Sequence, residues 1–317
     1  MTDADGAHTT IDEVLANTDL SAQTILITGA ASGLGLKSAQ AFAQRGARLV
    51  LTVRNAQKAA DAFASVRSLA PNPNTIELFE LDLAAFASIR KFTTQLLDQK
   101  RHFTTLMANA GVMACPEART EDGFELQFGT NHLGHFLLVN RLVPALLTNT
   151  PARVVVLSSG AHRRGEVSLD DPNFERTPYA PWVAYGRSKT ANALFAVALD
   201  AKLKGRGIRA CSISPGAVGE TNLSRHMTAE DLERLRSAPG RRPVFKTLAE
   251  GAATQAWATI APAETIGSHY LENCAVADII SDPNQTNGVM AFAQDPEKAQ
   301  SLWAASEGFV GETFNWS

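Results

Sequence analysis

The sequence has few cysteines, and none of them is spaced to hold a metal. Cys115, Cys211 and Cys274 lie far apart, and no Cys-x-x-Cys motif is present. A cysteine zinc site and a disulfide framework are therefore not predicted. Sparse, unpaired cysteine is typical of a reducing compartment, and the predicted location is the cytoplasm.

Long hydrophobic runs are also missing. No stretch of about 18 or more consecutive apolar residues is present, so no membrane-spanning helix is predicted. Residues 1–20 are polar and acidic, and they lack the basic and apolar regions of a signal peptide. The sequence thus favours a protein without a membrane span.

Neither sign of charge is in large excess. The net charge is -3 and the pI is about 6.2, which gives no electrostatic case for a nucleic-acid partner or an anionic membrane. Apolar residues make up 45% of the 317 residues. That is enough for the core of one large α/β domain.

The hydrophobic pattern alternates between continuous apolar runs and helical periodicity. The predicted strands are 24–28, 48–53, 75–79, 105–108, 152–157 and 208–213. The predicted helices are 36–46, 56–69, 88–99, 124–147 and 184–203. This order predicts a single-domain, doubly wound parallel sheet with helices on both faces. Residues 1–22 are an extension, with a short helix at 11–15, and 23–317 form the domain.

A glycine-rich loop follows the first predicted strand. Gly29, Gly33 and Gly35 give the spacing Gly-x-x-x-Gly-x-Gly between a strand and a helix. Such a loop lets the backbone pass close to a pyrophosphate at the helix N-terminus. The loop therefore predicts a dinucleotide site, and the alternative is a tight turn without a ligand.

The end of the second strand bears on the choice between NAD and NADP. It reads Thr52-Val53-Arg54-Asn55 and has no carboxylate to hold a ribose 2′-hydroxyl. Arg54 offers a cation for a 2′-phosphate, so NADP(H) is favoured and NAD(H) stays open. Ser32 supplies no second cation in the glycine loop, and the alternative for Arg54 is an ordinary solvated side chain.

Tyr185 and Lys189 are four residues apart on a predicted helix, so they share one face. The ammonium group would favour the tyrosinate and lower the pKa of the phenol, which suits a general acid and base. Such a pair alone is usually a surface feature. Downstream of a glycine-rich strand, turn and helix, it predicts carbonyl chemistry.

Further motifs lie where predicted strands end or in the helix that follows. They are Asp82-Leu83, Asn109-Ala110-Gly111, Asn131, Ser158-Ser159 and Pro215-Gly216. With the glycine loop and the Tyr-Lys pair, they resemble the short-chain dehydrogenase/reductase family over residues 22–290. The segment 123–136, the run 158–162 and the 26-residue gap from Ser159 to Tyr185 resemble the retinol-dehydrogenase and WW-domain-oxidoreductase-like branch. The resemblance implies a Rossmann-type fold.

The resemblance also implies catalytic roles. Tyr185 would be the general acid in reduction and the base in oxidation, and Lys189 would bind the nicotinamide ribose. Ser159 would hold the substrate oxygen, with Ser158 as its rival, and Asn131 would anchor a water in a proton relay. The implied cofactor contacts are Gly29, Ser32, Gly33, Leu34, Gly35, Arg54, Asp82, Leu83, Asn109, Ala110, Gly111, Tyr185, Lys189, Pro215, Gly216 and Val218.

The chain departs from the family in the segment after Pro215-Gly216. Thr221 stands one residue later than the family's carboxamide-binding Thr, which leaves that role in doubt. His132 and His135 lack a carboxylate or cysteine companion, so packing is expected and no metal is predicted. A substrate lid is expected around 219–245.

The predicted function is NADP(H)-dependent hydride transfer with a hydrophobic secondary alcohol, ketone or aldehyde. The alternatives are an NAD-linked alcohol dehydrogenase of the same fold and a non-catalytic dinucleotide-sensing protein. A homodimer or homotetramer that pairs helices 124–147 and 184–203 is expected. The apolar C-terminal residues, which include Trp303, Phe314 and Trp316, are expected to pack on the body or on a partner subunit.

Overall fold

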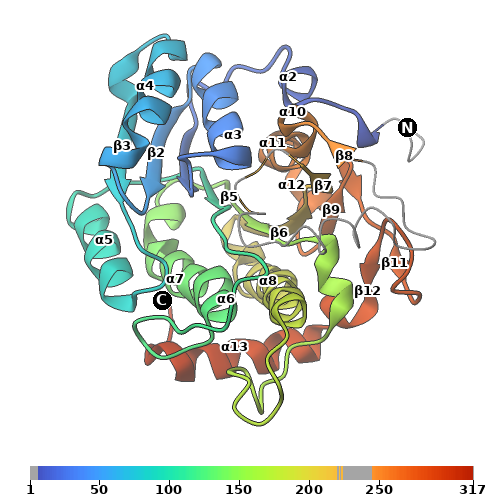
Figure 1. Cartoon of the computed structure of the whole chain (residues 1–317). Coiled ribbons are helices and arrows are strands. Elements are labelled where there is room, and N and C mark those ends of the chain that lie inside the picture. The colour runs from blue at the N-terminus through green and yellow to red at the C-terminus, as the bar shows by residue number, and fades with distance from the viewer. Residues whose placement is uncertain (1–5, 220, 222, 224–244, 317) are drawn as a thin grey trace.

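An eight-stranded sheet forms the centre of the computed structural model, which describes residues 6–219, 221, 223 and 245–316 (Figure 1). The strand order is β10-β9-β6-β5-β4-β1-β2-β3, and only the edge strand β10 is antiparallel to its neighbour. The strands are β1 (Thr24–Thr28), β2 (Arg48–Val53), β3 (Ile76–Glu80), β4 (Thr105–Ala108), β5 (Ala152–Leu157), β6 (Ile208–Ser214), β9 (Tyr270–Glu272) and β10 (Ala275–Val276).

The six predicted strands are all present, and the reason is their composition. Strands β1, β2 and β5 are nearly continuous runs of apolar and β-branched residues, and they are buried along most of their length. Strands covered on both faces need such runs. The predicted α/β fold is confirmed, with an antiparallel edge that the sequence analysis did not anticipate.

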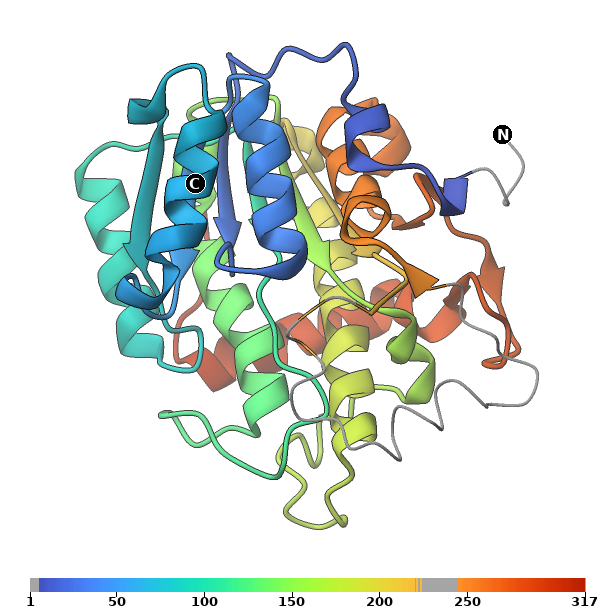
Figure 2. The ribbon, with the colours of Figure 1, turned by 45° about the horizontal axis from the view of Figure 1, so that its top comes forward.

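Helices cover both faces of the sheet, as the two main clusters of buried side chains and Figure 2 show. One layer contains α3, α4 and α11, and the other contains α5, α7 and α8. Their bounds are α3 (Gly33–Gln44), α4 (Ala60–Leu69), α11 (Ala253–Ile260), α5 (Phe86–Asp98), α7 (Gly134–Leu147) and α8 (Pro181–Leu203).

Shorter elements complete the described chain. Two small parallel pairs join β7 (Ala217–Val218) to β8 (Phe245–Lys246) and β11 (Ile279–Ile280) to β12 (Val289–Met290). The short helices are α2 (Ile11–Val14), α10 (Leu248–Gly251), α12 (Ala263–Ile266), η1 (Gln57–Ala59), η2 (Pro73–Thr75), η4 (Gly160–Arg164), η5 (Lys204–Arg206) and η7 (Ala291–Ala293).

The region predicted as one helix over 124–147 is interrupted. It consists of α6 (Leu126–Phe128), a π-helical turn, η3 (Gly129–Leu133), and then α7. The buried Glu125 carboxylate caps α6 by accepting from the backbone amides of Gln127 and Phe128 at 2.9 and 2.7 Å. Such turns are common at functional sites, and Asn131 lies in the middle of this one.

The N-terminal extension packs onto the domain. Thr10 and Glu13 form a reciprocal capping box at the start of α2. Ile11 and Leu15 are fully buried in the cluster that includes α3 and α11. The helix predicted at 11–15 is therefore present, and it contributes to the core.

A C-terminal helix, α13 (Pro296–Val310), lies across the α7 and α8 layer (Figure 1). The Trp303 ring packs edge-on against Phe136 of α7 at 5.0 Å and tilted against Phe195 of α8 at 6.0 Å between centroids. Trp316 donates from Nε1 to the backbone oxygen of Asn140 at 3.0 Å. The tail thus packs on the body, and it covers the helices that were expected to pair with a partner subunit.

Two ion pairs fix the tail in place. The Glu312 carboxylate accepts from Arg90 Nε at 2.6 Å and from Arg141 Nη1 at 2.7 Å. These arginines lie on α5 and α7, so one acidic side chain joins the tail to two helices. Residues 290–316, in which no helix or strand was predicted, therefore pack on the body of the protein.

The expected lid at 219–245 lies almost entirely outside the described residues, which include only 219, 221, 223 and 245 of it. Within the described ranges, no helix is both long and apolar enough to cross a membrane.

Candidate active site

The sequence motifs converge at the carboxyl edge of the sheet. The glycine loop follows β1, Asn109 follows β4, Ser158 follows β5 and Pro215 follows β6. Strand β1 lies between β2 and β4, so the order of the strands reverses at β1 and β4. Ligands bind at such a switch point in doubly wound sheets.

The glycine loop leaves no room for side chains. Gly29 has φ +71°, and a β-carbon there would lie 2.9 Å from Cα of Ala110. A β-carbon on Gly35 would lie 2.5 Å from the Gly29 oxygen. The loop can therefore approach a ligand with its backbone, and only glycine fits these two positions.

The N-terminus of α3 is prepared for an anion. Ser32 is its N-cap but makes no capping hydrogen bond, and the first turn carries no acidic residue. The first amide groups and the positive end of the helix dipole are thus not neutralised by the cap. Asn109 adds a buried Oδ1 with no partner in the described part of the chain. These residues fit a dinucleotide, with the pyrophosphate at Gly33 and Leu34.

Arg54, the predicted 2′-phosphate ligand, is exposed at the end of β2. It forms no ion pair within the described ranges. Lys37, another cation near the loop, is already paired with Asp12 at 3.0 Å. Arg54 is therefore a cation at this strand end that no described acidic side chain neutralises by an ion pair.

Glu80 is a feature of this strand end that the sequence analysis missed. It ends β3 directly beside Val53 of β2, and its Oε1 accepts from the Ala56 amide at 2.8 Å. Only the register between the two strands reveals it, because Glu80 is far from Arg54 in sequence. A carboxylate at this position weakens the electrostatic preference for a 2′-phosphate.

Asp82 and Leu83, two of the implied cofactor contacts, make contacts within the protein. Asp82 Oδ1 accepts from the Ala84 amide at 2.8 Å. Leu83 is buried, and its backbone oxygen would lie 2.4 Å from a β-carbon on Gly134. Gly134 therefore lets the start of α7 approach the loop after β3.

Tyr185, Lys189 and Ser159 form the centre of the site. The Tyr185 and Lys189 residues are only 4% and 2% exposed, and Lys189 Nζ lies 5.7 Å from the centroid of the Tyr185 ring. The Ser159 side chain hydrogen-bonds to Tyr185. Lys189 Nζ donates to the Leu157 oxygen at 2.9 Å. Four residues apart on α8, the pair shares one buried face as expected.

Burial sets the protonation of this pair. It raises the pKa of Tyr185 to about 12, and the hydrogen bond from Ser159 offsets only part of that rise. Burial also lowers the pKa of Lys189 to about 7. The direction is opposite to the expected lowering of the phenol pKa by the lysine, because burial disfavours the tyrosinate.

The two serines after β5 have different bonds. Ser158 is 1% exposed and donates its hydroxyl proton to the Lys189 backbone oxygen at 2.7 Å. Ser159 Oγ accepts from the Ala161 amide at 3.2 Å and faces Tyr185. The geometry thus favours Ser159 over its rival as the group that meets a substrate.

Asn131 is fully buried in the π-helical turn. Its Nδ2 donates to the Val112 oxygen and to Ser188 Oγ, both at 2.9 Å, and its Oδ1 accepts from the Val112 amide at 2.8 Å. A β-carbon on Gly111 would lie 3.0 Å from Asn131 Oδ1 and 3.6 Å from Lys189 Nζ. Asn131 and Lys189 therefore meet beside Gly111.

His162 lies behind Ser159. Its Nε2 accepts from the Met290 amide at 3.1 Å, so the remaining proton is on Nδ1. Nδ1 then donates to the Ser159 backbone oxygen at 2.8 Å. Burial lowers the pKa of His162 to about 4, so the ring is neutral. These contacts support a structural role for His162 in the core.

The segment after β6 is held by a lysine that the sequence analysis did not single out. A β-carbon on Gly216 (φ +79°) would lie 3.0 Å from Cε of Lys246, and Lys246 pairs with Val218. Lys246 Nζ donates to Asn273 Oδ1 at 2.7 Å. Burial lowers the pKa of Lys246. The contact with Gly216 arises only in the fold.

Thr221, which stands one residue late for the family pattern, lies at the glycine loop. Its Cγ2 would be 3.5 Å from a β-carbon on Gly33. The side chain is thus near the predicted pyrophosphate position.

Two aromatic residues before Tyr185 have different roles. The Tyr179 hydroxyl donates to the Cys115 oxygen at 3.0 Å and accepts from Gln127 Nε2 at 3.0 Å, which ties it to α6 and to the loop before it. The Trp182 ring lies edge-on to the Tyr185 ring at 6.3 Å. Trp182 therefore borders Tyr185 directly.

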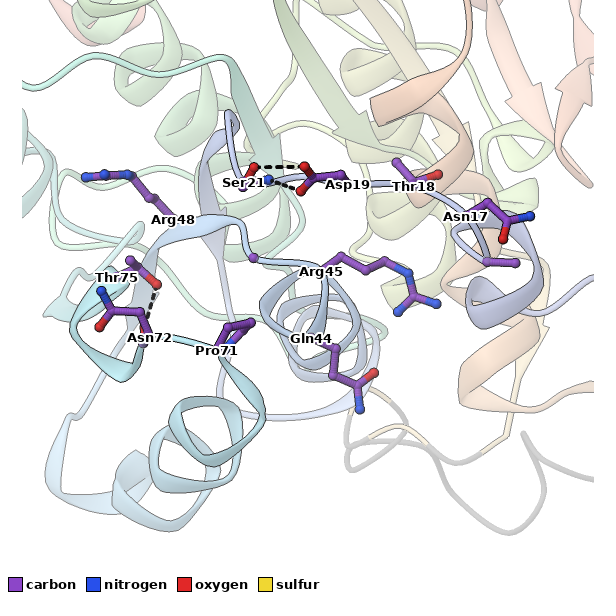
Figure 3. Close-up of a pocket in the computed structure, with 12 residues that line it drawn as sticks. Asn17, Thr18, Asp19, Ser21, Gln44, Arg45, Arg48, Pro71, Asn72 and Thr75 are labelled. Atoms are coloured by element: carbon purple, nitrogen blue, oxygen red, sulfur yellow. Dashed lines mark hydrogen bonds between the residues drawn. The ribbon is translucent and has the colours of Figure 1, made fainter.

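A shallow hollow of about 730 Å³ lies at the opposite edge of the sheet (Figure 3). Its lining residues include Arg45, Arg48 and Asn72, which precede or begin strands. Arg45 is engaged with the Leu15 oxygen at 2.6 Å. No predicted site residue lines this hollow.

His132, the histidine of the π-helical turn, contacts the C-terminal helix. Its Nε2 lies 2.9 Å from Ser306 Oγ on α13. Among the residues whose structure is described, no three His, Cys, Asp or Glu side chains gather to hold a metal ion.

Known proteins with similar sequences cover nearly the whole chain. The family model for short chain dehydrogenase matches residues 23–232. Retinol dehydrogenase 14 of Mus musculus is 37% identical over 299 residues, which are 91% of this chain and 86% of that protein. The matched family segment contains both the glycine loop and the Tyr185–Lys189 pair.

Solved structures support the same comparison. A crystal structure of an uncharacterised protein from Mycobacterium paratuberculosis has a TM-score of 0.74 and 34% identity, covering 95% of this chain and 98% of that one. A short chain dehydrogenase from Burkholderia cenocepacia J2315 in complex with NADP has a TM-score of 0.63 and 20% identity, covering 80% and 97%. The second likeness is one of fold.

Proposed function

The chain belongs to the short-chain dehydrogenase/reductase family of oxidoreductases, in its retinol-dehydrogenase-like branch, and from that premise we propose that it catalyses NADP(H)-dependent interconversion of a hydrophobic alcohol and its ketone or aldehyde. The observation that carries the proposal is the contact of Tyr185 with Ser159 beside the buried Lys189. These three groups provide a proton, a hydrogen bond and a cation at one place.

In the proposed reaction, Tyr185 gives its phenolic proton to the carbonyl oxygen during reduction and recovers it during oxidation. Ser159 donates a hydrogen bond to the same oxygen as negative charge develops. A bound nicotinamide dinucleotide would supply or accept the hydride at its C4. Burial of Tyr185 keeps the phenol protonated, which suits the acid role.

Lys189 and Asn131 support the proton transfer. Lys189 has a pKa of about 7 and can therefore exchange a proton at neutral pH. Asn131 lies beside Lys189, and its side chain is hydrogen-bonded to Val112 and Ser188. These bonds fix the residue, so its backbone carbonyl is held in one place. We propose that this carbonyl anchors a water molecule next to Lys189.

NADP(H) is the proposed cofactor, held at the sixteen contacts named above. The exposed Arg54 supports a 2′-phosphate, and the distant structure from Burkholderia cenocepacia contains NADP. Glu80 favours the second candidate, an NAD-linked enzyme, because its carboxylate lies at the same strand end. Titration with NADPH and with NADH, each followed by fluorescence, separates the two.

The proposed substrate is hydrophobic. Trp182 borders Tyr185 with an apolar ring surface, and the relative from Mus musculus is called a retinol dehydrogenase. The proposed lid at 219–245 would add apolar side chains. A panel of aliphatic, aromatic and polyene aldehydes, each tested with NADPH, examines this part of the proposal.

Assembly and location remain predictions. We propose a homodimer or homotetramer, and since α13 covers α7 and α8, the partner would contact another surface or the outer face of α13. We also propose a cytoplasmic location. Sedimentation of the purified full chain and fractionation of cells test the two predictions.

The decisive test of function compares wild type with Tyr185→Phe. The proposal requires NADPH-dependent carbonyl reduction by wild type and its loss in the variant, while NADPH binding remains. Binding without turnover of any panel member by wild type would support a dinucleotide-sensing protein instead.

A further inference from the structure

We infer that His135 is a positioning residue that fixes the Asn131 carbonyl and links it to the dinucleotide loop. This inference rests on the proposed function, since it assigns Asn131 a place in the proton transfer. His135 is fully buried at the start of α7, four residues after Asn131. Its two ring nitrogens contact two different parts of the site.

Donor and acceptor counts assign the proton on the ring. Thr28 Oγ1 accepts from the amides of Asn109 and Ala110, both at 2.9 Å, which uses both of its lone pairs. The hydroxyl proton of Thr28 is directed at His135 Nε2, which lies 2.9 Å away. The alternative acceptor, the Met107 backbone oxygen, is farther away at 3.5 Å. Nε2 is therefore an acceptor, and the ring proton is on Nδ1.

The Nδ1 proton of His135 points to the π-helical turn that contains Asn131. His135 Nδ1 lies 2.9 Å from the Asn131 backbone oxygen, so the ring donates to that carbonyl. Asn131 lies in the π-helical turn, where backbone bonds do not follow the regular α-helical spacing. A side-chain donor in a fixed tautomer holds the carbonyl in one direction.

The other end of the chain of hydrogen bonds lies in the predicted cofactor site. Thr28 ends β1 directly before Gly29, and Asn109 and Ala110 follow β4. A shift of either loop changes the position of Thr28 Oγ1 and therefore of His135. The ring thus connects the loops that would bind the dinucleotide with the carbonyl of the proton relay.

His132 is the matched control for this idea. It lies three residues earlier, is also fully buried, and contacts Ser306 of α13 through Nε2. Its Nδ1 has no partner among the described residues. Replacement of His132 should therefore cost stability, but it should leave the Asn131 carbonyl in place.

Three substitutions separate the two bonds of His135. His135→Asn can keep an N–H near the position of Nδ1, His135→Gln can keep an acceptor near Nε2, and His135→Leu keeps neither. The assays are NADPH binding by fluorescence and steady-state kinetics with NADPH and decanal, or with another panel aldehyde that wild type reduces faster. We expect His135→Leu and His135→Gln to lower kcat about 10- to 100-fold, as misplacement of a reacting group does.

Substrate KM and the NADPH dissociation constant should stay within about threefold in these variants, because ground-state binding is retained. His135→Asn should recover most of kcat, and His132→Asn should leave kcat unchanged while it lowers Tm. The inference is overturned if His135→Leu keeps the wild-type kcat. It is equally overturned if His135→Asn folds and is as slow as His135→Leu.

The tautomer provides a readout that needs neither turnover nor a stable variant. Ring nitrogen NMR of the selectively labelled wild-type protein should show His135 with its proton on Nδ1. A proton on Nε2 would contradict the inference even if the variants failed to fold. A wild type that reduces no carbonyl with NADPH or NADH would refute the proposed function, and the NMR result would still decide the assignment of the ring proton.

Discussion

Mild acid should unfold this protein, because three neutral histidines are buried in it. Burial lowers the pKa of His132 to about 3 and those of His135 and His162 to about 4, from 6.5 in each case. The folded state therefore binds fewer protons than the unfolded state at any pH between about 4 and 6.5. Stability falls as pH falls through that window, and the loss is complete near the folded pKa values.

The size of this effect follows from the shifts. One pKa unit corresponds to about 1.4 kcal/mol, so each histidine costs about 3 kcal/mol when the pH reaches 4. Together they cost on the order of 10 kcal/mol, which is comparable with the total stability of a typical domain, about 5–15 kcal/mol. Glu125 opposes them in part, since burial raises the pKa of its carboxyl.

The assay is thermal melting by circular dichroism at pH 7.5, 6.0, 5.0 and 4.5 with constant ionic strength. We expect Tm to fall steadily below pH 6.5 and the folded state to be lost between about pH 5 and 4. Non-titrating variants such as His132→Gln should flatten the slope. An unchanged Tm from pH 7.5 to 5.0 would show that the histidines are solvated or paired differently, and the reasoning would fail.

Three further predictions concern the cofactor end, the substrate side and the tail. Arg54→Ala should weaken NADPH binding about 10-fold or more and leave NADH binding unchanged; equal effects on both, measured by fluorescence titration, would remove Arg54 from the phosphate site. Trp182→Ala should raise KM for long aldehydes about 10-fold and change that for short ones less, as lost apolar contact predicts; a uniform change across chain lengths in steady-state assays would argue against a substrate contact. Glu312→Gln should lower the unfolding free energy by about 2 kcal/mol, because two half-buried arginines lose their shared carboxylate; denaturation in urea that leaves the midpoint unchanged would show that the tail is held by its aromatic residues alone.

Features that depend on contacts between residues close in sequence could be predicted from the sequence. The glycine loop is one example, because Gly29 has φ +71° and a β-carbon on Gly35 would lie 2.5 Å from the Gly29 oxygen of the same strand, turn and helix. The face shared by Tyr185 and Lys189 is another, because residues four apart on α8 must lie together. These features depend on backbone geometry that a short segment determines by itself.

Features that depend on tertiary contacts could not be predicted. The position of Glu80 beside β2 follows from strand register, and Lys246 reaches Gly216 only through the β7–β8 pair. The π-helical turn at Asn131 interrupts a segment whose periodicity indicates one helix. The Tyr-Lys spacing predicted a lowered pKa for Tyr185, whereas burial of the phenol in the fold raises it.

The most direct test of the central claim follows a labelled hydride. The full chain is incubated with NADPH carrying deuterium at C4, with each hydrogen of that carbon labelled in turn, and with a hydrophobic aldehyde, and the product is analysed by mass spectrometry. Wild type should place one deuterium on the alcohol carbon with one of the two labels, and Tyr185→Phe should do so about 100- to 10,000-fold more slowly with unchanged NADPH affinity. Equal rates of deuterium transfer in the two proteins would contradict the role of Tyr185.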